Sequence, residues 1–248
     1  MNPRNHKIFS ALFAVAFVVI VQWFASPMPV FRFLIPGFLI YVAAIMVYNW
    51  RFLKSRGHYN KWLFLRLPIF LIFWFSLLFV IPLGFGRALF LLVSIPVIFF
   101  FETLIENTGQ QIGWNIFLLS LASLLIGMYG FNFYFPLTGL IYLFLLFVGM
   151  ALLVRTSVET VPHNTNVKWL AALVLALFSA ELFWVLQFLP LHFSVLAVIN
   201  FNILYLLWAI YYHYLYQTLT ARQIQFNILL ALGLSIIVLL SSPWSILN

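Results

Sequence analysis

Long apolar runs, each about 20 residues in length, follow one another along this chain of 248 residues. Because an α-helix rises about 1.5 Å per residue, a run of this length can cross the roughly 30 Å hydrocarbon core of a lipid bilayer. Pro, Gly, Asn and Ser residues, which favour turns, separate the runs. The sequence predicts about nine transmembrane helices, at residues 8–25, 32–50, 62–82, 85–105, 113–130, 134–154, 168–189, 193–215 and 222–242.

The shortage of charged residues excludes a water-soluble fold. Hydrophobic residues make up 66% of the chain and charged residues only 6%, whereas an ordinary soluble domain is about one quarter charged. A folded chain of this size exposes much of its surface, and it has too few polar side chains to cover that surface in water. We expect an all-α fold, a polytopic membrane helix bundle that forms a single transmembrane domain over residues 1–248.

The positions of the cations indicate how the bundle lies in the membrane. Lys and Arg are enriched in cytoplasmic connectors, and an odd number of spans places the two termini on opposite sides. With a cytoplasmic N-terminus, only Arg32 and Arg87 of the 12 Lys and Arg residues fall outside. We therefore expect the N-terminus inside and the C-terminus outside, in the plasma membrane. The inner side receives Arg4, Lys7, Arg51, Lys54, Arg56, Lys61, Arg66, Arg155, Lys168 and Arg222.

The net charge of +8 predicts a lipid partner rather than nucleic acid. The cations lie in short connectors between apolar runs, where anionic lipid head groups on the cytoplasmic side are the simplest partner. Protein partners or a homo-oligomer are also compatible with the sequence.

The chain contains neither cysteine nor aspartate, which narrows its chemistry. Disulfides, thiolate zinc sites, thiol nucleophiles and aspartate pairs are excluded. No two of the five histidines occur at metal-ligand spacing on one helix face. A phosphate-binding glycine-rich motif is also absent from the sequence. We expect no cofactor and no metal site, assign no catalytic residue, and favour a protein that is not an enzyme.

Small residues indicate where helices pack, because in lipid they let two backbones approach closely. The predicted span at 168–189 carries Ala172, Ala176 and Ala180 at every fourth position. These residues lie on one face of a helix. We expect that face to pack against a neighbouring helix.

Glu181 is the first candidate for a functional site, because an unpaired carboxylate inside a membrane helix costs at least about 2.5 kcal/mol. The spans at 168–189 and 193–215 form a hairpin, which brings Glu181, Asn200 and Asn202 to a similar depth, roughly 15 Å from the turn. Asn200 and Asn202 point in nearly opposite directions, so only one is expected to face Glu181. Arg87 completes this predicted polar site with an ion pair, if its helix is a neighbour. The alternative is a protonated or hydrogen-bonded Glu181 that only joins helices.

A second candidate site combines Glu102 and Glu106, which lie four residues apart on one face at the inner end of the span at 85–105. Two carboxylates in this arrangement can share a proton or hold a cation. The alternative is structural, since salt bridges to the nearby cytoplasmic cations would account for both glutamates.

These features favour binding or transport of a small molecule, ion or lipid through a polar site within the bundle. Two alternatives stay open at this point. One is a non-catalytic assembly or scaffold subunit of a membrane complex, whose polar residues only join helices. The other is an intramembrane enzyme that acts on a lipid or a membrane protein, with Glu102 and Glu106 as its acids.

Overall fold

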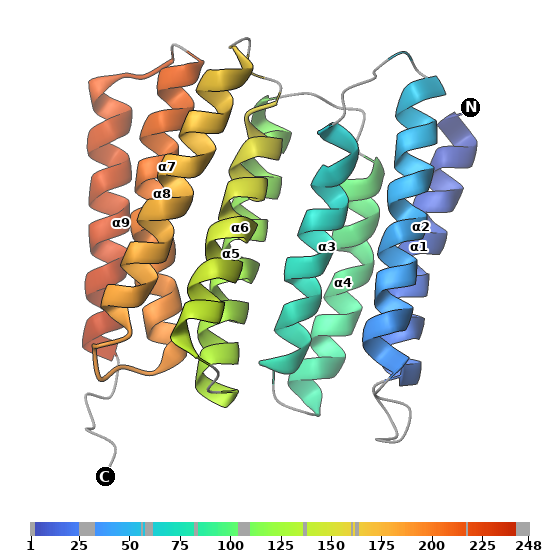
Figure 1. Cartoon of the computed structure of the whole chain (residues 1–248), viewed down its shortest axis with the longest axis horizontal. Helices are drawn as coiled ribbons and strands as arrows, with labels where there is room; N and C mark the ends of the chain where they lie inside the picture. Colours follow the sequence, from blue (N-terminus) through green and yellow to red (C-terminus); the bar gives the residue numbers. More distant parts are fainter. Residues whose placement is uncertain are drawn as a thin grey trace. The chain divides into compact units, whose positions relative to one another are not determined.

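The computed structural model of the chain is built from α-helices (Figure 1). It describes residues 3–24, 33–55, 57, 62–81, 84–103, 110–135, 138–159, 161, 164–216 and 218–241. Within these ranges there are nine α-helices and no β-strand, which confirms the predicted all-α fold. The helices are α1 (Pro3–Phe24), α2 (Leu34–Ser55), α3 (Arg66–Ser76), α4 (Phe85–Thr103), α5 (Gln110–Tyr134), α6 (Gly139–Ser157), α7 (Thr165–Leu186), α8 (Phe193–Leu215) and α9 (Ala221–Ser241), and the 3-10 turns η2 (Leu63–Leu65) and η3 (Leu77–Phe79) flank α3.

The helices have the length and apolar surface of membrane spans. Seven of them in the described part of the chain, α2 and α4 to α9, are long and apolar enough to cross a bilayer. Shorter apolar helices occupy His6–Gln22 and Leu63–Phe79. Large side chains such as Phe85 and Leu140 are 82% and 77% exposed, and lipid rather than water accommodates such a surface. The protein is therefore a multi-spanning integral membrane protein.

Each predicted span corresponds mainly to one helix, except that the span at 62–82 is built from η2, α3 and η3. Several helix ends differ from the predicted boundaries. The span predicted at 193–215 coincides with α8. Helix α7 begins three residues earlier than predicted, because Asn164 accepts a hydrogen bond from the Asn166 amide and caps the helix. Helix α2 extends beyond the predicted end at Trp50 to Ser55, since the long side chains of residues such as Lys54 can hold their charge away from lipid.

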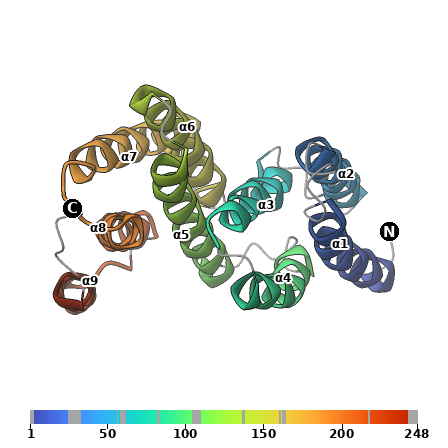
Figure 2. The ribbon, with the colours of Figure 1, turned by 90° about the horizontal axis from the view of Figure 1, so that it is seen from below.

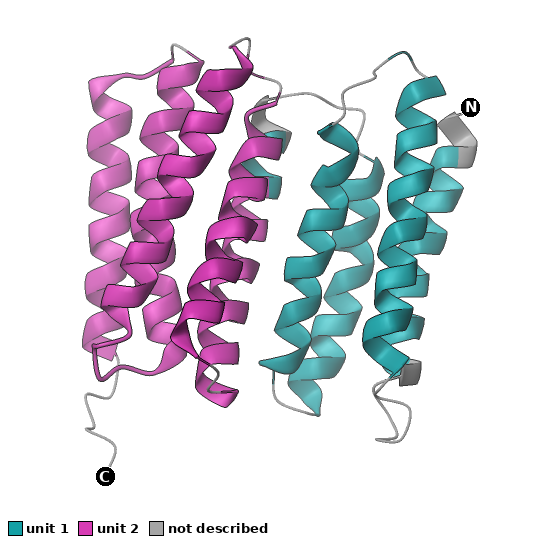
Figure 3. Cartoon of the chain, in the orientation of Figure 1, with its two compact units in different colours: residues 1–116 teal, residues 117–248 magenta. Residues whose placement is uncertain are grey.

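The chain divides into two compact units, residues 1–116 and residues 117–248 (Figure 3). Helices α1 to α4 belong to the first unit and α6 to α9 to the second. Helix α5 begins in the first unit and continues into the second. Each unit is described separately below.

In the first unit, α1 packs against both α2 and α4 (Figure 2). Aromatic side chains fill the α1–α2 contact, where Phe17 lies 6.2 Å from Phe38 between ring centroids. The Trp74 indole N–H donates a 2.7 Å hydrogen bond to Ser94 and joins α3 to α4. This packing brings the start of α1 to the ends of α2 and α4.

In the second unit, α7 packs most extensively against α6, and α8 packs against α9. Helix α5 contacts α8 through the stacked rings of Phe117 and Trp208, whose centroids are 3.9 Å apart. An ion pair between Arg155 and Glu159 lies at the end of α6. The two hairpins, α6–α7 and α8–α9, therefore form most of this unit.

Candidate functional site

Glu102 lies in the last turn of α4 and is completely buried in the first unit, with 0% of its surface exposed. Burial follows from the packing of α1 along α4. A buried carboxylate is costly unless it is neutralised or hydrogen-bonded. Its immediate partners therefore decide what the group can do.

Asn49 is the side-chain partner of Glu102. It lies on α2, is also 0% exposed, and donates a 3.2 Å hydrogen bond from Nδ2 to Glu102 Oε2. An uncharged amide satisfies one carboxylate oxygen without cancelling the negative charge. The contact thus orients the carboxyl group and leaves its negative charge without a counter-charge from Asn49.

His6, on α1, closes the same end of the unit over the backbone of Glu102. Its Nε2 lies 3.1 Å from the Glu102 carbonyl oxygen, and its Nδ1 lies 3.2 Å from Tyr48 Oη. A carbonyl oxygen can only accept, so Nε2 carries a hydrogen, and when the ring is neutral Nδ1 accepts from Tyr48 Oη. The ring also stacks on Phe52, with centroids 3.9 Å apart. Histidine therefore ties α1 to α2 and α4 at the site.

Two buried oxygens at this site have no hydrogen-bond partner among the described residues. They are Glu102 Oε1 and Asn49 Oδ1, which belong to the two side chains that already touch. Buried polar atoms are nearly always satisfied in folded proteins. The unsatisfied Glu102 Oε1 indicates a place for a proton or a small cation, because a buried carboxylate oxygen without a donor is costly.

The number of oxygens favours the proton over a metal ion. Divalent ions such as Ca²⁺ take about 6–8 oxygen ligands. No group of three or more His, Asp or Glu side chains gathers in the part of the chain that the structure describes. A proton, by contrast, needs only the Glu102 carboxyl group to carry it, and Asn49 to hydrogen-bond the other carboxyl oxygen. We refer to Glu102 and Asn49, together with His6 over the Glu102 backbone, as the Glu102 site.

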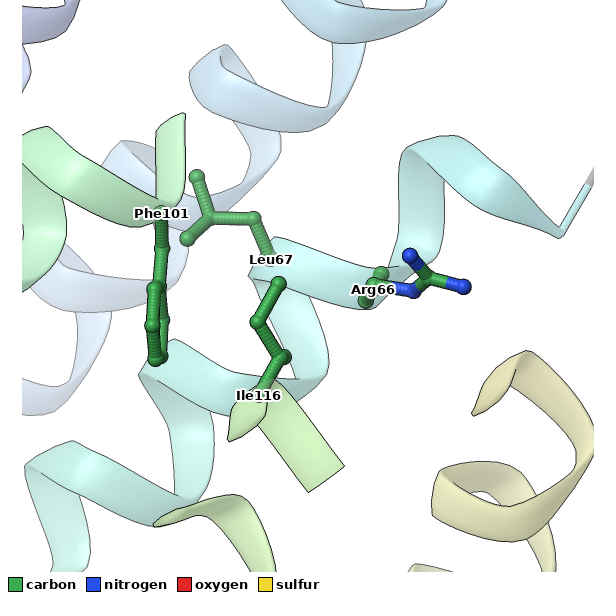
Figure 4. A pocket seen from close by; sticks show the side chains of 4 residues that line it. All are labelled: Arg66, Leu67, Phe101 and Ile116. Atoms are coloured by element: carbon green, nitrogen blue, oxygen red, sulfur yellow. The ribbon is translucent and has the colours of Figure 1, made fainter. Parts of the chain in front are cut away.

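A small cavity also lies in the first unit, next to the residue that precedes Glu102. It measures about 10 Å³ and is lined by Arg66, Leu67, Phe101 and Ile116 (Figure 4). The Arg66 guanidinium points away from Phe101 and Leu67 in this view. The cavity is barely large enough for one water molecule. It therefore has no room for a solute, and the Glu102 site is the better candidate.

Only one member of the predicted Glu102–Glu106 pair can be located. Glu106 lies outside the described residues, so its pairing with Glu102 stays a prediction. The alternative of a salt-bridged Glu102 finds no support within the described ranges, where the Glu102 side chain makes a hydrogen bond to Asn49 and no ion pair.

The other predicted site, in the second unit, is not gathered into one cluster around Glu181. Glu181 is exposed on α7 and makes no hydrogen bond or ion pair to any described residue. It lies five residues before the end of the helix at Leu186, so it is about 7.5 Å from that end. A carboxylate near a helix end lies closer to the head-group region than one at the middle of a span, so its charge costs less there.

Asn200 and Asn202 are both buried on α8 but turn to different helices. Asn200 donates a 3.0 Å hydrogen bond to Tyr129 Oη on α5, and Asn202 donates a 3.1 Å bond to Ser235 on α9. This divergence agrees with the nearly opposite directions expected for residues two apart on a helix. Each asparagine donates its Nδ2 hydrogen bond to a neighbouring helix, and neither bond is made to Glu181.

Arg87 lies in the first turn of α4, in the first unit, whereas Glu181 belongs to the second. Its Nε is buried without a hydrogen-bond partner among the described residues. The predicted ion pair between the two side chains stays a prediction.

Sequence reasoning missed His6 and Asn49. A hairpin fixes the relative depth of residues only in consecutive spans. The Glu102 site instead joins α1, α2 and α4, and the His6–Glu102 contact spans 96 residues. One feature of the sequence does connect these residues: His6, Asn49 and Glu102 all lie at the predicted inner ends of their spans, and so at a similar depth in the membrane. Depth does not reveal which helices are neighbours, so it could not select these three residues.

Comparisons of this chain with protein-family models, with curated proteins and with solved structures found no match.

Proposed function

We propose that this protein is a transporter-like membrane protein that moves protons, alone or together with a small solute, and that Glu102 carries the proton. One observation supports this role above the others. The carboxyl group is completely buried, and its Oε1 has no donor among the described residues. We place the protein in the plasma membrane as part of the same proposal.

The chemistry follows from the low polarity of the site. With a proton on Oε1, Glu102 is neutral and its hydroxyl can donate a hydrogen bond while Asn49 holds the other oxygen. Without the proton, the charge requires water or a cation beside it. Release of the proton therefore requires the site to open to water, and uptake allows it to close. A proton carrier needs this coupling between the charge of Glu102 and the access of water to the site.

A proton-flux assay tests the proposal. The purified protein is placed in liposomes that contain a pH-sensitive dye, and a pH difference is imposed across the membrane. Glu102→Gln keeps the shape of a protonated glutamate but cannot release a proton, so we expect the protein-dependent flux to fall about tenfold or more. Asn49→Leu should reduce the flux as well, because the carboxyl group loses its orienting partner.

Glu181→Gln is the matched control, because it makes the same chemical change on an exposed residue. We expect this variant to keep the flux of the unmodified protein. Circular dichroism and gel filtration would confirm that all variants are folded. An unchanged flux in a folded Glu102→Gln variant would overturn the proposal.

The two other functions expected from the sequence stay predictions. A scaffold subunit would copurify with a protein partner and would lose assembly on Glu102→Gln. A lipid-directed enzyme would lose turnover when either Glu102 or Glu106 is replaced by alanine while keeping its fold.

A further inference from the structure

An apolar groove of about 300 Å³ lies between α7 and α8 in the second unit. Helix α7 contributes Ala171, Val174 and Leu175 to its walls, and α8 contributes Leu207, Ile210 and Tyr211. The volume is at the lower limit of ligand sites, which range from about 300 to 1,000 Å³. The groove therefore suits one slender apolar group rather than a bulky solute.

The groove lies within one leaflet of the membrane. Ala171 and Leu175 are six and ten residues from the start of α7 at Thr165, which corresponds to about 9 and 15 Å along the helix. Half of a bilayer's hydrocarbon core is about 15 Å thick. A chain that enters from the start of α7 would thus run along the groove parallel to the neighbouring lipid chains.

Tyr211 gives the groove a polar feature at a defined level. Its hydroxyl is buried and has no hydrogen-bond partner among the described residues. Tyr211 lies four residues before the end of α8 at Leu215, about 6 Å from that end. Ester carbonyls of glycerolipids lie at this boundary between hydrocarbon and head groups, and a carbonyl oxygen can accept the hydrogen bond that Tyr211 lacks.

Cations lie at the same end of these helices. Lys168 is three residues before Ala171 on α7, and Arg222 is exposed near the start of α9, three residues after the wall residue Leu219. Lys168 donates one hydrogen bond to the Glu159 carbonyl at 2.8 Å and has two further N–H donors. The carboxylate of Glu159 forms an ion pair with Arg155, so Arg155, Lys168 and Arg222 together outnumber it at this end of the helices.

We propose that this groove binds one acyl chain of an anionic glycerophospholipid. An ester carbonyl of the lipid accepts a hydrogen bond from Tyr211 Oη, and its phosphate lies near Lys168 and Arg222. The three features select the same ligand independently: the apolar walls select the chain, the hydroxyl selects the ester, and the cations select the head group. The site is separate from the Glu102 site and does not depend on proton transport.

Thermal unfolding of the purified protein in detergent, with added lipid, tests this proposal. Phosphatidylglycerol and phosphatidylcholine with identical oleoyl chains serve as the two probes, so that only the head group differs. At a lipid concentration about one hundred times the Kd, we expect phosphatidylglycerol to raise the Tm of the unmodified protein by about 5–10 °C. Phosphatidylcholine should raise it by less than half as much.

Three variants remove the three features of the site one at a time. Val174→Trp fills the groove from a partly exposed position, so it should remove the response to phosphatidylglycerol without disturbing the core. Lys168→Gln should reduce the response to that of phosphatidylcholine. Tyr211→Phe removes only the hydroxyl and should reduce the response to both lipids. Val174→Phe replaces Val174→Trp if the latter does not fold.

Each variant has a control elsewhere on the molecule. Leu173→Trp adds the same ring to an exposed neighbour that does not line the groove, and Lys7→Gln removes a cation from the first unit. Both should keep the full response. Two outcomes would overturn the proposal: equal stabilisation by both lipids, or a response to phosphatidylglycerol that survives in folded Val174→Trp and Lys168→Gln variants.

Discussion

Glu102 and Glu181 are both glutamates in spanning helices, yet their surroundings differ. Glu102 is completely buried beside Asn49, whereas Glu181 is exposed on α7. A buried carboxylate without a counter-charge must be protonated or hydrogen-bonded, whereas an exposed one near a helix end lies closer to the head groups. Both glutamates lie in spanning helices, so it is burial that makes Glu102 a stronger functional candidate than Glu181.

The hydrogen bond between Asn200 and Tyr129 provides a test at the scale of single residues. Both side chains are at least 98% buried, and Asn200 Oδ1 has no partner among the described residues. Tyr129→Phe would leave the Asn200 amide unsatisfied as well, so we expect it to lower the free energy of unfolding by about 1–2 kcal/mol. A double-mutant cycle with Asn200→Leu should give a coupling energy of about 0.5–1.5 kcal/mol.

Tyr134→Phe is the control for this cycle, because Tyr134 is 49% exposed at the end of α5. Its effect on unfolding should be within about 0.5 kcal/mol of zero. Additive effects of Tyr129→Phe and Asn200→Leu would show that the bond contributes nothing to stability.

At the scale of helices, α7 is organised by its small residues. Ala172 and Ala176 are 0% exposed and Ala180 is 9% exposed, while Leu177, outside this row, is 54% exposed. This agrees with the packing face expected from the four-residue spacing. Because these alanines are buried in a closely packed bundle, a larger side chain on this face must displace its neighbours.

Ala176→Leu should therefore destabilise the protein. Added volume in a well-packed core costs about 1–3 kcal/mol, measurable as a decrease in Tm in detergent. Leu177→Phe adds volume to the exposed side of the same helix and should leave Tm nearly unchanged. Equal effects of the two substitutions would mean that α7 is not packed through its alanines.

The helices themselves were largely predictable from the sequence, and their ends were less so. Hydropathy predicted both ends of α8 correctly. Pro190 and the turn near Leu191 mark the start of this helix in the sequence. The start of α7 depends instead on a side-chain cap at Asn164, which hydropathy does not register. Glu102 was identified as a candidate from its sequence position, but its partners Asn49 and His6 depend on the packing of α1 against α2 and α4.

At the scale of the whole molecule, the topology can be tested because the chain has no cysteine. Single cysteines are introduced by Lys7→Cys in α1 and Ser241→Cys at the end of α9, both at exposed positions. If the chain crosses the membrane nine times, a membrane-impermeant maleimide will label Lys7→Cys from the cytoplasmic side and Ser241→Cys from the opposite side. Labelling of both from one side would require an even number of spans.

The contact between His6 and Glu102 has a consequence for biosynthesis. The two residues are 96 positions apart, and ribosomes add about 5–20 residues per second, so His6 is made about 5–20 s before Glu102. During that interval α1 and α2 are already available for insertion, but the carbonyl and carboxylate that bind His6 and Asn49 do not yet exist. We therefore expect α1 and α2 to pair first through His6, Tyr48 and Phe52, and the first unit to be completed only when α4 emerges.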